Sequence, residues 1–244
     1  MRIVIINQAR MTSTRLPGKV LKEVMEKPLL EYQIERLKKV KLADELVIAT
    51  TVNPADQPII DLCRKLNIAY YRGSEEDVLS RYYEAAKEYR ADAVVRVTSD
   101  CPLIDPVVID LIIDTYIKNS GKYDYISNTI ERTYPRGMDT EILSFAALEE
   151  AHKKAVLKPE REHVTLYIYS HPEKFKIFSV KYKKDESKHR WTVDTKEDFK
   201  LVKTILERLY PYKKDFTMED CLELIEQNPD IFNINQHIKQ KAIE

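Results

Sequence analysis

Short apolar runs alternate with amphipathic segments over the first half of the chain. The runs of strand length are Arg2–Asn7, Glu45–Thr51, Ile68–Tyr71 and Ala93–Thr98. The segments with apolar residues at helical spacing are Leu29–Val40, Ala55–Leu66, Val78–Tyr89 and Val107–Lys118. Strand and helix in strict alternation are typical of βαβ units. We therefore predict an α/β fold, with a mostly parallel sheet and helices on both of its faces.

This rhythm loosens after about residue 122. The expected strands there are Tyr123–Asn128, Phe175–Lys183 and Trp191–Val193, and the expected helices are Phe145–Lys154, Pro159–Ser170, Lys196–Leu209 and Thr217–Gln227. The sequence has no internal repeat and no Gly/Ser-rich linker. We therefore predict one domain over residues 1–244, made of a regular half (1–122) and a smaller mixed α+β half (123–244).

Charge and composition exclude several classes of protein. The chain has 40 basic and 40 acidic residues among its 244, so its net charge gives no support to a nucleic-acid partner. Its three cysteines form no CxxC pair, which argues against a disulfide framework or a zinc site. No apolar run reaches the roughly 20 residues of a membrane span, and no signal peptide is visible. We expect a cytoplasmic protein with no membrane partner.

A basic loop follows the first strand. Arg10, Arg15 and Lys19 lie in it together with Ser13 and Thr14, and no acidic residue occurs before Glu23. The carboxyl ends of parallel strands open into the ligand crevice of an α/β protein, where guanidinium, ammonium and hydroxyl groups suit phosphate oxygens. The loop matches neither GxxxxGK[ST] nor GxGxxG. The sequence predicts a phosphate-handling enzyme outside those two classes.

Two aspartates also follow short apolar runs. Asp100 comes directly after Ala93–Thr98, so its carboxylate should lie at the same sheet edge as the basic loop. A carboxylate that faces a triphosphate requires a cation between them, and Mg²⁺ is the natural one. A turn or a helix N-cap is the alternative role of Asp100. Asp194 ends the Trp191–Val193 run, and it or Thr195 could simply cap the following helix.

The basic loop resembles that of the CMP-Kdo and CMP-sialic acid synthetases, whose loop reads approximately A-R-x-x-S-x-R-L-P-x-K. The stretch Gln8–Leu21 (QARMTSTRLPGKVL) is still more similar to the spore coat polysaccharide biosynthesis protein F group within that superfamily. Four further motifs carry the resemblance over most of the chain. They are RGSEEDVLSR at 72–81, TSDCPL at 98–103, EHVT at 162–165 and WTVDTKED at 191–198.

The resemblance implies a nucleotide-diphospho-sugar transferase (GT-A-like) fold and a cytidylyltransferase activity. CMP would pass from CTP to an acidic sugar (Kdo-, sialic- or other nonulosonic-acid-like), with release of pyrophosphate, for surface polysaccharide biosynthesis. It implies Mg²⁺ as cofactor, bound by Asp100 and Asp194. The implied catalytic residues are Arg10, Lys19, Asp100 and Asp194. The implied nucleotide-binding residues are Ala9, Arg10, Ser13, Arg15, Lys19, Arg72, Gly73, Ser74, Asp77, Arg81 and Ser99.

The second half is expected to hold the sugar and to dimerise. The resemblance implies that Glu162 and His163 lie near the sugar. Arg136 and Asp139 lie in a turn-rich loop, where an arginine could bind a sugar carboxylate. Homodimerisation is expected through residues 123–139 and 175–183. Two alternatives stay open. One is a GT-A glycosyltransferase that uses an NDP-sugar, disfavoured because Asp100 lies in Ser-Asp-Cys and not in D-x-D. The other is a catalytically silent nucleotide-binding subunit.

Overall fold

A seven-stranded sheet forms the centre of the molecule. The computed structural model describes residues 1–240. In sheet order the strands are β5 (Ala69–Gly73), β4 (Glu45–Thr51), β1 (Ile3–Gln8), β6 (Ala93–Thr98), β8 (Glu141–Ser144), β7 (Tyr125–Ser127) and β9 (Ile177–Ser179). The first four are mutually parallel, and β8 is antiparallel to both β6 and β7. The predicted mostly parallel sheet is confirmed.

The strand residues belong alternately to the cores on the two faces of the sheet. Ile3 and Ile5 of β1 pack in one apolar cluster, and Val4 and Ile6 pack in another. All four are buried, as expected for a central parallel strand that is covered on both sides. This is why Arg2–Asn7 reads as a continuous apolar run.

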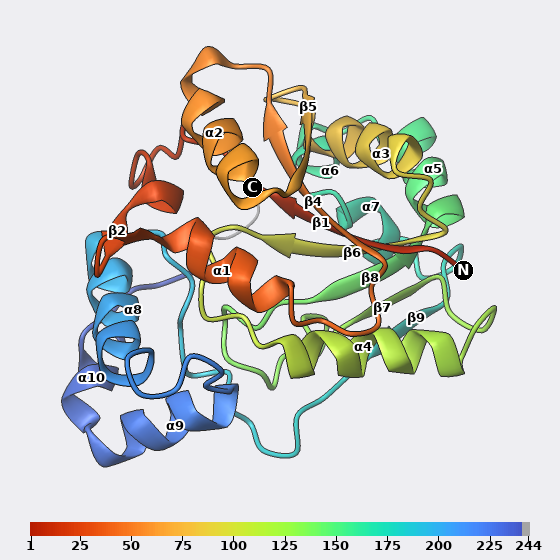
Figure 1. Ribbon diagram of the computed structural model, residues 1–244. Helices are drawn as coiled ribbons and strands as arrows, with labels where there is room; N and C mark the ends of the chain where they lie inside the picture. The colour runs from red at the N-terminus through yellow and green to blue at the C-terminus, as the bar shows by residue number, and fades with distance from the viewer. Residues whose placement is uncertain (241–244) are drawn as a thin grey trace.

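Helices cover both faces (Figure 1). The structure has α1 (Leu29–Leu37), α2 (Gln57–Leu66), α3 (Val78–Glu88), α4 (Pro106–Lys118), α5 (Phe145–Lys154), α6 (Lys158–Glu162), α7 (Leu166–Tyr169), α8 (Lys196–Leu209), α9 (Met218–Gln227) and α10 (Pro229–Asn233). Helices α1, α4, α8 and α9 share one apolar cluster with the sheet, and α3, α5 and α7 share the cluster of the opposite face. Helix α2 packs with part of α1 in a third.

Two predicted elements of the second half are wrong. Trp191–Val193 is no strand, because its backbone is held by an isolated bridge at Arg190 and by contacts to loops. The predicted helix Pro159–Ser170 is two short helices, α6 and α7, interrupted at His163, whose backbone leaves the helical region (φ −104°, ψ 62°).

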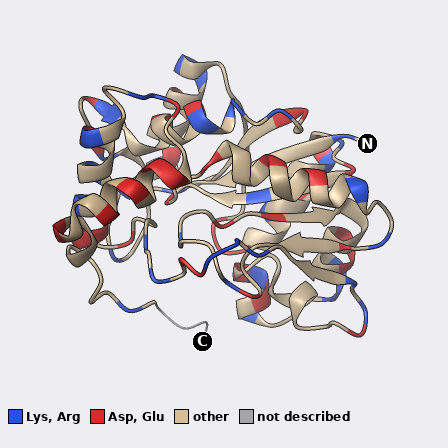
Figure 2. Ribbon diagram, turned by 90° about the horizontal axis from the view of Figure 1, so that it is seen from below, with Lys and Arg blue, Asp and Glu red and all other residues tan. Residues whose placement is uncertain are grey.

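Other short elements were not predicted. They are β8, α10, the 3₁₀ turns Lys19–Leu21 and Pro54–Asp56, and the small hairpin of β2 (Glu23–Val24) and β3 (Lys27–Pro28). Basic and acidic residues are interspersed along the helices and loops visible in Figure 2. Within residues 1–240, no helix is long and apolar enough to cross a membrane. The division into two functional halves stays a prediction.

Candidate active site

A cavity of about 850 Å³ opens at the carboxyl ends of β1 and β6. Thirteen of the predicted site residues line it: Ala9, Arg10, Ser13, Arg15, Lys19, Arg81, Ser99, Asp100, Arg136, Asp139, Glu162, His163 and Asp194. They come from segments separated by up to 185 residues in the sequence, which the parallel strands bring to one edge. This is the edge where α/β folds bind ligands.

The basic loop has a defined shape because it is tied at both ends. The Met11 amide donates to Asp56 Oδ1 (2.7 Å), and the Gly18 amide donates to the Met11 carbonyl oxygen (2.9 Å). Gly18 has φ +66°, which glycine adopts without steric cost. Buried Leu16 anchors the middle of the loop. Within the part of the chain that the structure describes, the amides of residues 12–16 bond to no protein acceptor, so they are available to an anion.

Lys19 joins the two aspartates. Its Nζ lies 2.9 Å from Asp100 Oδ2 and 2.8 Å from Asp194 Oδ1, and its side chain is only 12% exposed. Arg15 also reaches Asp194 Oδ1, at 3.0 Å. The basic loop, which was predicted to share a sheet edge with Asp100, therefore contacts both carboxylates in the folded chain.

Asp194 reaches this point because the segment before it is clamped. The Trp191 amide donates to the Arg136 carbonyl oxygen (2.7 Å), and the Val193 amide donates to that of Asp100 (2.8 Å). Thr195 and Asp198 form the capping box of α8. Thr195, and not Asp194, is thus the N-cap, which leaves the Asp194 carboxylate to face Lys19.

These charges shift the pKa values of one another. Burial alone would raise the pKa of Asp100, but the Lys19 ammonium and the hydroxyl of Thr98 (2.6 Å from Asp100 Oδ1) lower it to about 2. Burial acts to lower the pKa of Lys19, and the two carboxylates outweigh it and raise that pKa. Asp100 is therefore ionised and Lys19 protonated at neutral pH, so Asp100 is a charge carrier and a poor general base.

Arg190 supports the site from beneath. Its guanidinium donates to Asp194 Oδ2 (2.8 Å) and to Asp198 Oδ1 (3.0 Å), and its side chain is 7% exposed. Asn235 Nδ2 completes the cluster by donating to Asp198 Oδ1 (2.7 Å). Burial would lower the pKa of Arg190, but Asp198 and Asp194 raise it. Asp194 is thereby fixed from one side by a buried cation and meets the cavity with its other oxygen.

The residues present suit Mg²⁺. Two hard carboxylate oxygens, one each from Asp100 and Asp194, converge on a single cation position, which the ammonium of Lys19 occupies. Mg²⁺ is usually held by one or two carboxylates together with substrate phosphates, and not by a complete protein cage. Among residues 1–240, no cluster of three or more His, Cys, Asp or Glu side chains able to hold a metal is present.

Four residues predicted to bind the nucleotide lie outside the cavity lining and shape it indirectly. Arg72 donates to the carbonyl oxygens of residues 51 and 52. The Ser74 carbonyl accepts from Arg81 (2.9 Å), and Gly73 lies so close to Arg81 that a Cβ would come within 3.0 Å of it. Asp77 caps α3. A direct contact of these four with nucleotide stays a prediction.

Asp77 has a second role that sequence reasoning missed. Arg161 donates to both of its carboxylate oxygens (3.0 and 2.5 Å) and to the His152 carbonyl oxygen (2.7 Å). This clamp holds α6 against α3, and it places Glu162 and His163 at the cavity wall.

Arg136 and Asp139 differ in how they are engaged. Both oxygens of Asp139 are taken by the Arg132 guanidinium (2.5 and 2.9 Å). Burial, and then the neighbouring Arg132, lower the pKa of Arg136. Among residues 1–240, the Arg136 guanidinium has no hydrogen bond or ion pair. It is thus a cation at the cavity wall that is available to an anion.

Sequence reasoning missed several residues of the cavity wall. The wall also includes Arg96, Glu141, Lys158 and Thr192. Arg96 Nη1 donates to Glu141 Oε1 (2.6 Å) across β6 and β8. A signal for Arg96 existed, because it interrupts the apolar strand AVVRVT; Thr192 offered none, since its place depends on the clamped segment.

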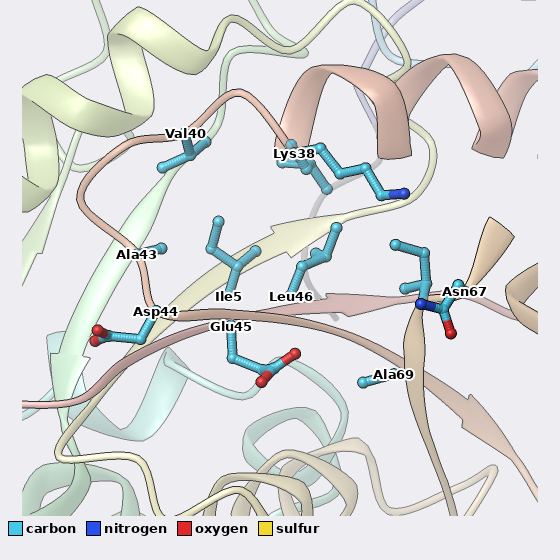
Figure 3. A pocket seen from close by; sticks show the side chains of 11 residues that line it. Ile5, Lys38, Val40, Ala43, Asp44, Glu45, Leu46, Asn67 and Ala69 are labelled. Carbon is cyan, nitrogen blue, oxygen red and sulfur yellow. The ribbon is translucent and has the colours of Figure 1, made fainter.

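A second, smaller hollow of about 250 Å³ lies near the amino ends of β4 and β5 (Figure 3). Aliphatic side chains such as Ile5 and Leu46 form much of its wall. Two of its charged groups are engaged: Asp44 accepts from the Ile3 amide (2.7 Å), and Lys38 donates to the Leu66 carbonyl oxygen (3.1 Å). This hollow therefore offers no comparable set of convergent charges.

The fold and the site together define an α/β nucleotidyltransferase. The sequence profile of the cytidylyltransferase family matches residues 3–238, and the chain belongs to that family. It is 32% identical to spore coat polysaccharide biosynthesis protein SpsF of Bacillus subtilis, over 93% of this chain and 95% of that one. It is 30% identical to the 3-deoxy-manno-octulosonate cytidylyltransferase of Geobacter metallireducens, over 69% and 75% of the two chains.

A solved structure agrees over the full length. The structure of a cytidylyltransferase from Leptospira borgpetersenii superposes with a TM-score of 0.92 at 37% identity, covering 99% of this chain and 100% of that one. The resemblance seen in the sequence is thereby confirmed.

Proposed function

We propose that this enzyme transfers CMP from CTP to an acidic sugar and releases pyrophosphate, as a step in surface polysaccharide biosynthesis. One observation carries the proposal above the others. Lys19 brings Asp100 and Asp194 together beside a loop in which the amides of residues 12–16 and the Arg10 guanidinium make no hydrogen bond within the described residues. That arrangement offers a triphosphate both cationic donors and the two carboxylates of a magnesium site.

The reaction is a direct displacement at phosphorus. The anomeric hydroxyl oxygen of the sugar forms a bond to the α-phosphorus of CTP, the bond from that phosphorus to the β-phosphate bridging oxygen breaks, and the hydroxyl proton is released to solvent. Arg10, Arg15 and Lys19 line the cavity where the phosphates would lie. They offset the charge that develops on the leaving pyrophosphate, so catalysis consists mostly of positioning and electrostatics.

Asp100 and Asp194 are the residues that would hold Mg²⁺. When bound, the ion would neutralise phosphate charge and orient the α-phosphate. The chain's own part is to keep the Asp100 carboxylate ionised, as its low pKa ensures, and to hold the Asp194 carboxylate in place through its contact with Arg190.

We infer an acidic acceptor because the cavity wall offers a cation, Arg136, that can bind a sugar carboxylate. Arg136 lines the cavity with an unengaged guanidinium, whereas Asp139 is neutralised by Arg132. A planar guanidinium binds a carboxylate through two parallel hydrogen bonds. Glu162 and His163 lie at the same wall, and in this proposal they contact the hydroxyl groups of the sugar.

We further propose a homodimer in a reducing, cytoplasmic setting. Ile130 and Phe178 are exposed apolar side chains on the predicted dimer surface, and β9 is an edge strand of the sheet. The reducing setting is supported by Cys63, Cys101 and Cys221, which are unpaired and buried. Light scattering is expected to give twice the mass of the 28.7 kDa chain; a single monomeric species at high concentration would contradict the dimer.

Calorimetric titration with nucleotides tests the proposal without knowledge of the sugar. In the presence of Mg²⁺, CTP is expected to bind at least about 10-fold tighter than UTP, ATP, GTP, UDP-sugars or GDP-sugars, a difference of about 1.4 kcal/mol. A preference for an NDP-sugar would instead support a glycosyltransferase. Absence of binding by every nucleotide would refute the proposed function.

A further inference from the structure

The carboxylates that face the cavity already have bonding partners. Asp100 Oδ2 accepts from Lys19, and Asp100 Oδ1 accepts from the Thr98 hydroxyl (2.6 Å). Asp194 Oδ1 is shared by Lys19 and by Arg15, at 2.8 and 3.0 Å. A cation that binds both carboxylates must therefore take the place of a group that the chain itself supplies.

The partners of these carboxylates differ in their freedom to move. Arg190, which holds Asp194 Oδ2, is buried and is tied to Asp198 as well. Arg15, in contrast, is 42% exposed, and Lys19 lies at the end of the basic loop on a long flexible stem. Only the two loop cations can leave without disrupting the core.

We infer that Lys19 is an exchangeable counter-ion that holds the metal site closed until nucleotide arrives, an inference that rests on the proposed function. In the free enzyme Lys19 occupies the cation position between Asp100 and Asp194. When the metal–nucleotide complex binds, Lys19 and Arg15 transfer from the carboxylates to the phosphate oxygens. Lys19 is thus a positioning residue for the free carboxylates, and it contacts the substrate only afterwards.

Charge balance explains why the exchange requires the nucleotide. A divalent cation alone would push the Lys19 ammonium out of a partly buried position with no new anion to meet, and like charges at close range repel strongly there. The triphosphate supplies that anion. The structure therefore predicts ordered binding, in which free metal binds weakly and the metal–nucleotide complex binds well.

The test is to measure Mn²⁺ binding, as a paramagnetic probe, in the complete absence of nucleotide. Lys19→Met is expected to bind Mn²⁺ at least about 10-fold tighter than wild type, because the competing cation is gone. The same variant is expected to bind the Mn²⁺–CTP complex at least about 10-fold more weakly, because it lacks a phosphate ligand. A residue that merely maintained the fold would weaken both.

Matched variants make the result specific. Lys22→Met removes the same charge a few residues on, from a side chain that lies over the Phe199 ring and contacts neither carboxylate; it should leave Mn²⁺ affinity at the wild-type value. Lys19→Met/Asp100→Asn should lose the gained affinity. Circular dichroism checks folding, and Lys19→Gln replaces Lys19→Met if the latter is unfolded.

Unchanged or weaker Mn²⁺ binding by the folded Lys19 variant would overturn the inference. So would a wild type that binds Mn²⁺ alone as tightly as that variant does. If CTP is not the preferred nucleotide, the proposed function fails, but the nucleotide-free arm still reports on the exchange.

Discussion

Replacing Asp100 by asparagine is expected to lower the turnover of CTP by about 10²-fold or more. The substitution keeps the size of the side chain and removes the charge that faces Lys19 and, in the proposed mechanism, the metal. Because its pKa is about 2, Asp100 carries its negative charge at neutral pH and at mildly acidic pH. Release of pyrophosphate from CTP in the presence of an acceptor sugar is the measurement.

Asp110→Asn is the control for this prediction. Asp110 lies on α4 away from the cavity lining, where its carboxylate accepts from the amides of residues 41 and 42. Turnover of this variant should stay within about 2-fold of wild type. Near-wild-type turnover in Asp100→Asn would show that Asp100 has no catalytic role.

Arg190→Met is expected to destabilise the protein more than any surface substitution. It leaves Asp194 and Asp198, both buried, without the cation that pairs them. Loss of one partner of a buried ion pair costs about 3–5 kcal/mol. For a chain of this size the melting temperature should fall by roughly 10 °C, measured by thermal unfolding followed by circular dichroism.

Lys188→Met is the comparison for the stability effect. Lys188 lies two residues before Arg190, and its side chain is 61% exposed and only loosely paired with Glu186, at 3.8 Å. Such a surface substitution changes stability by less than about 0.5 kcal/mol. Equal melting temperatures for Arg190→Met and Lys188→Met would show that the buried cluster does not support Asp194 energetically.

Several strands and helices of the fold were predictable because their signals are local. Glu45–Thr51 and Ala93–Thr98 are strands with the predicted bounds, since a parallel strand buried on both faces has a mostly apolar sequence. Phe145–Lys154 and Lys196–Leu209 are helices with the predicted bounds as well. In both helices the residue before the first turn, Ser144 or Thr195, caps the backbone.

The second half was less predictable because its structure depends on contacts distant in sequence. Trp191–Val193 is apolar like a strand, but the Asp100 and Arg136 backbones hold it as an extended loop. Strand β8 begins with Glu141, a charged residue that is buried because Arg96 and Tyr125 bond to its carboxylate. No periodicity rule can anticipate partners that lie 45 and 16 residues away.

The candidate site, like the fold, contains residues that the sequence could identify and residues that it could not. The basic loop and both aspartates could be found, because each follows directly after an apolar run and the motif around each is characteristic. Arg190 could not, because nothing in KHRWTVD marks it as the buried partner of Asp194 and Asp198. The link between α6 and α3 through Arg161 was hidden for the same reason: the pair with Asp77 spans 84 residues.

The most direct test of the central claim is the release of pyrophosphate by the wild-type enzyme, with Mg²⁺, from each nucleoside triphosphate in turn. The acceptor panel should contain acidic sugars, among them 3-deoxy-manno-octulosonate, and matched neutral sugars. The account predicts release from CTP only when an acidic sugar is present, with formation of a CMP-linked sugar of matching stoichiometry. Transfer of a sugar from an NDP-sugar donor, without pyrophosphate release from CTP, would contradict it.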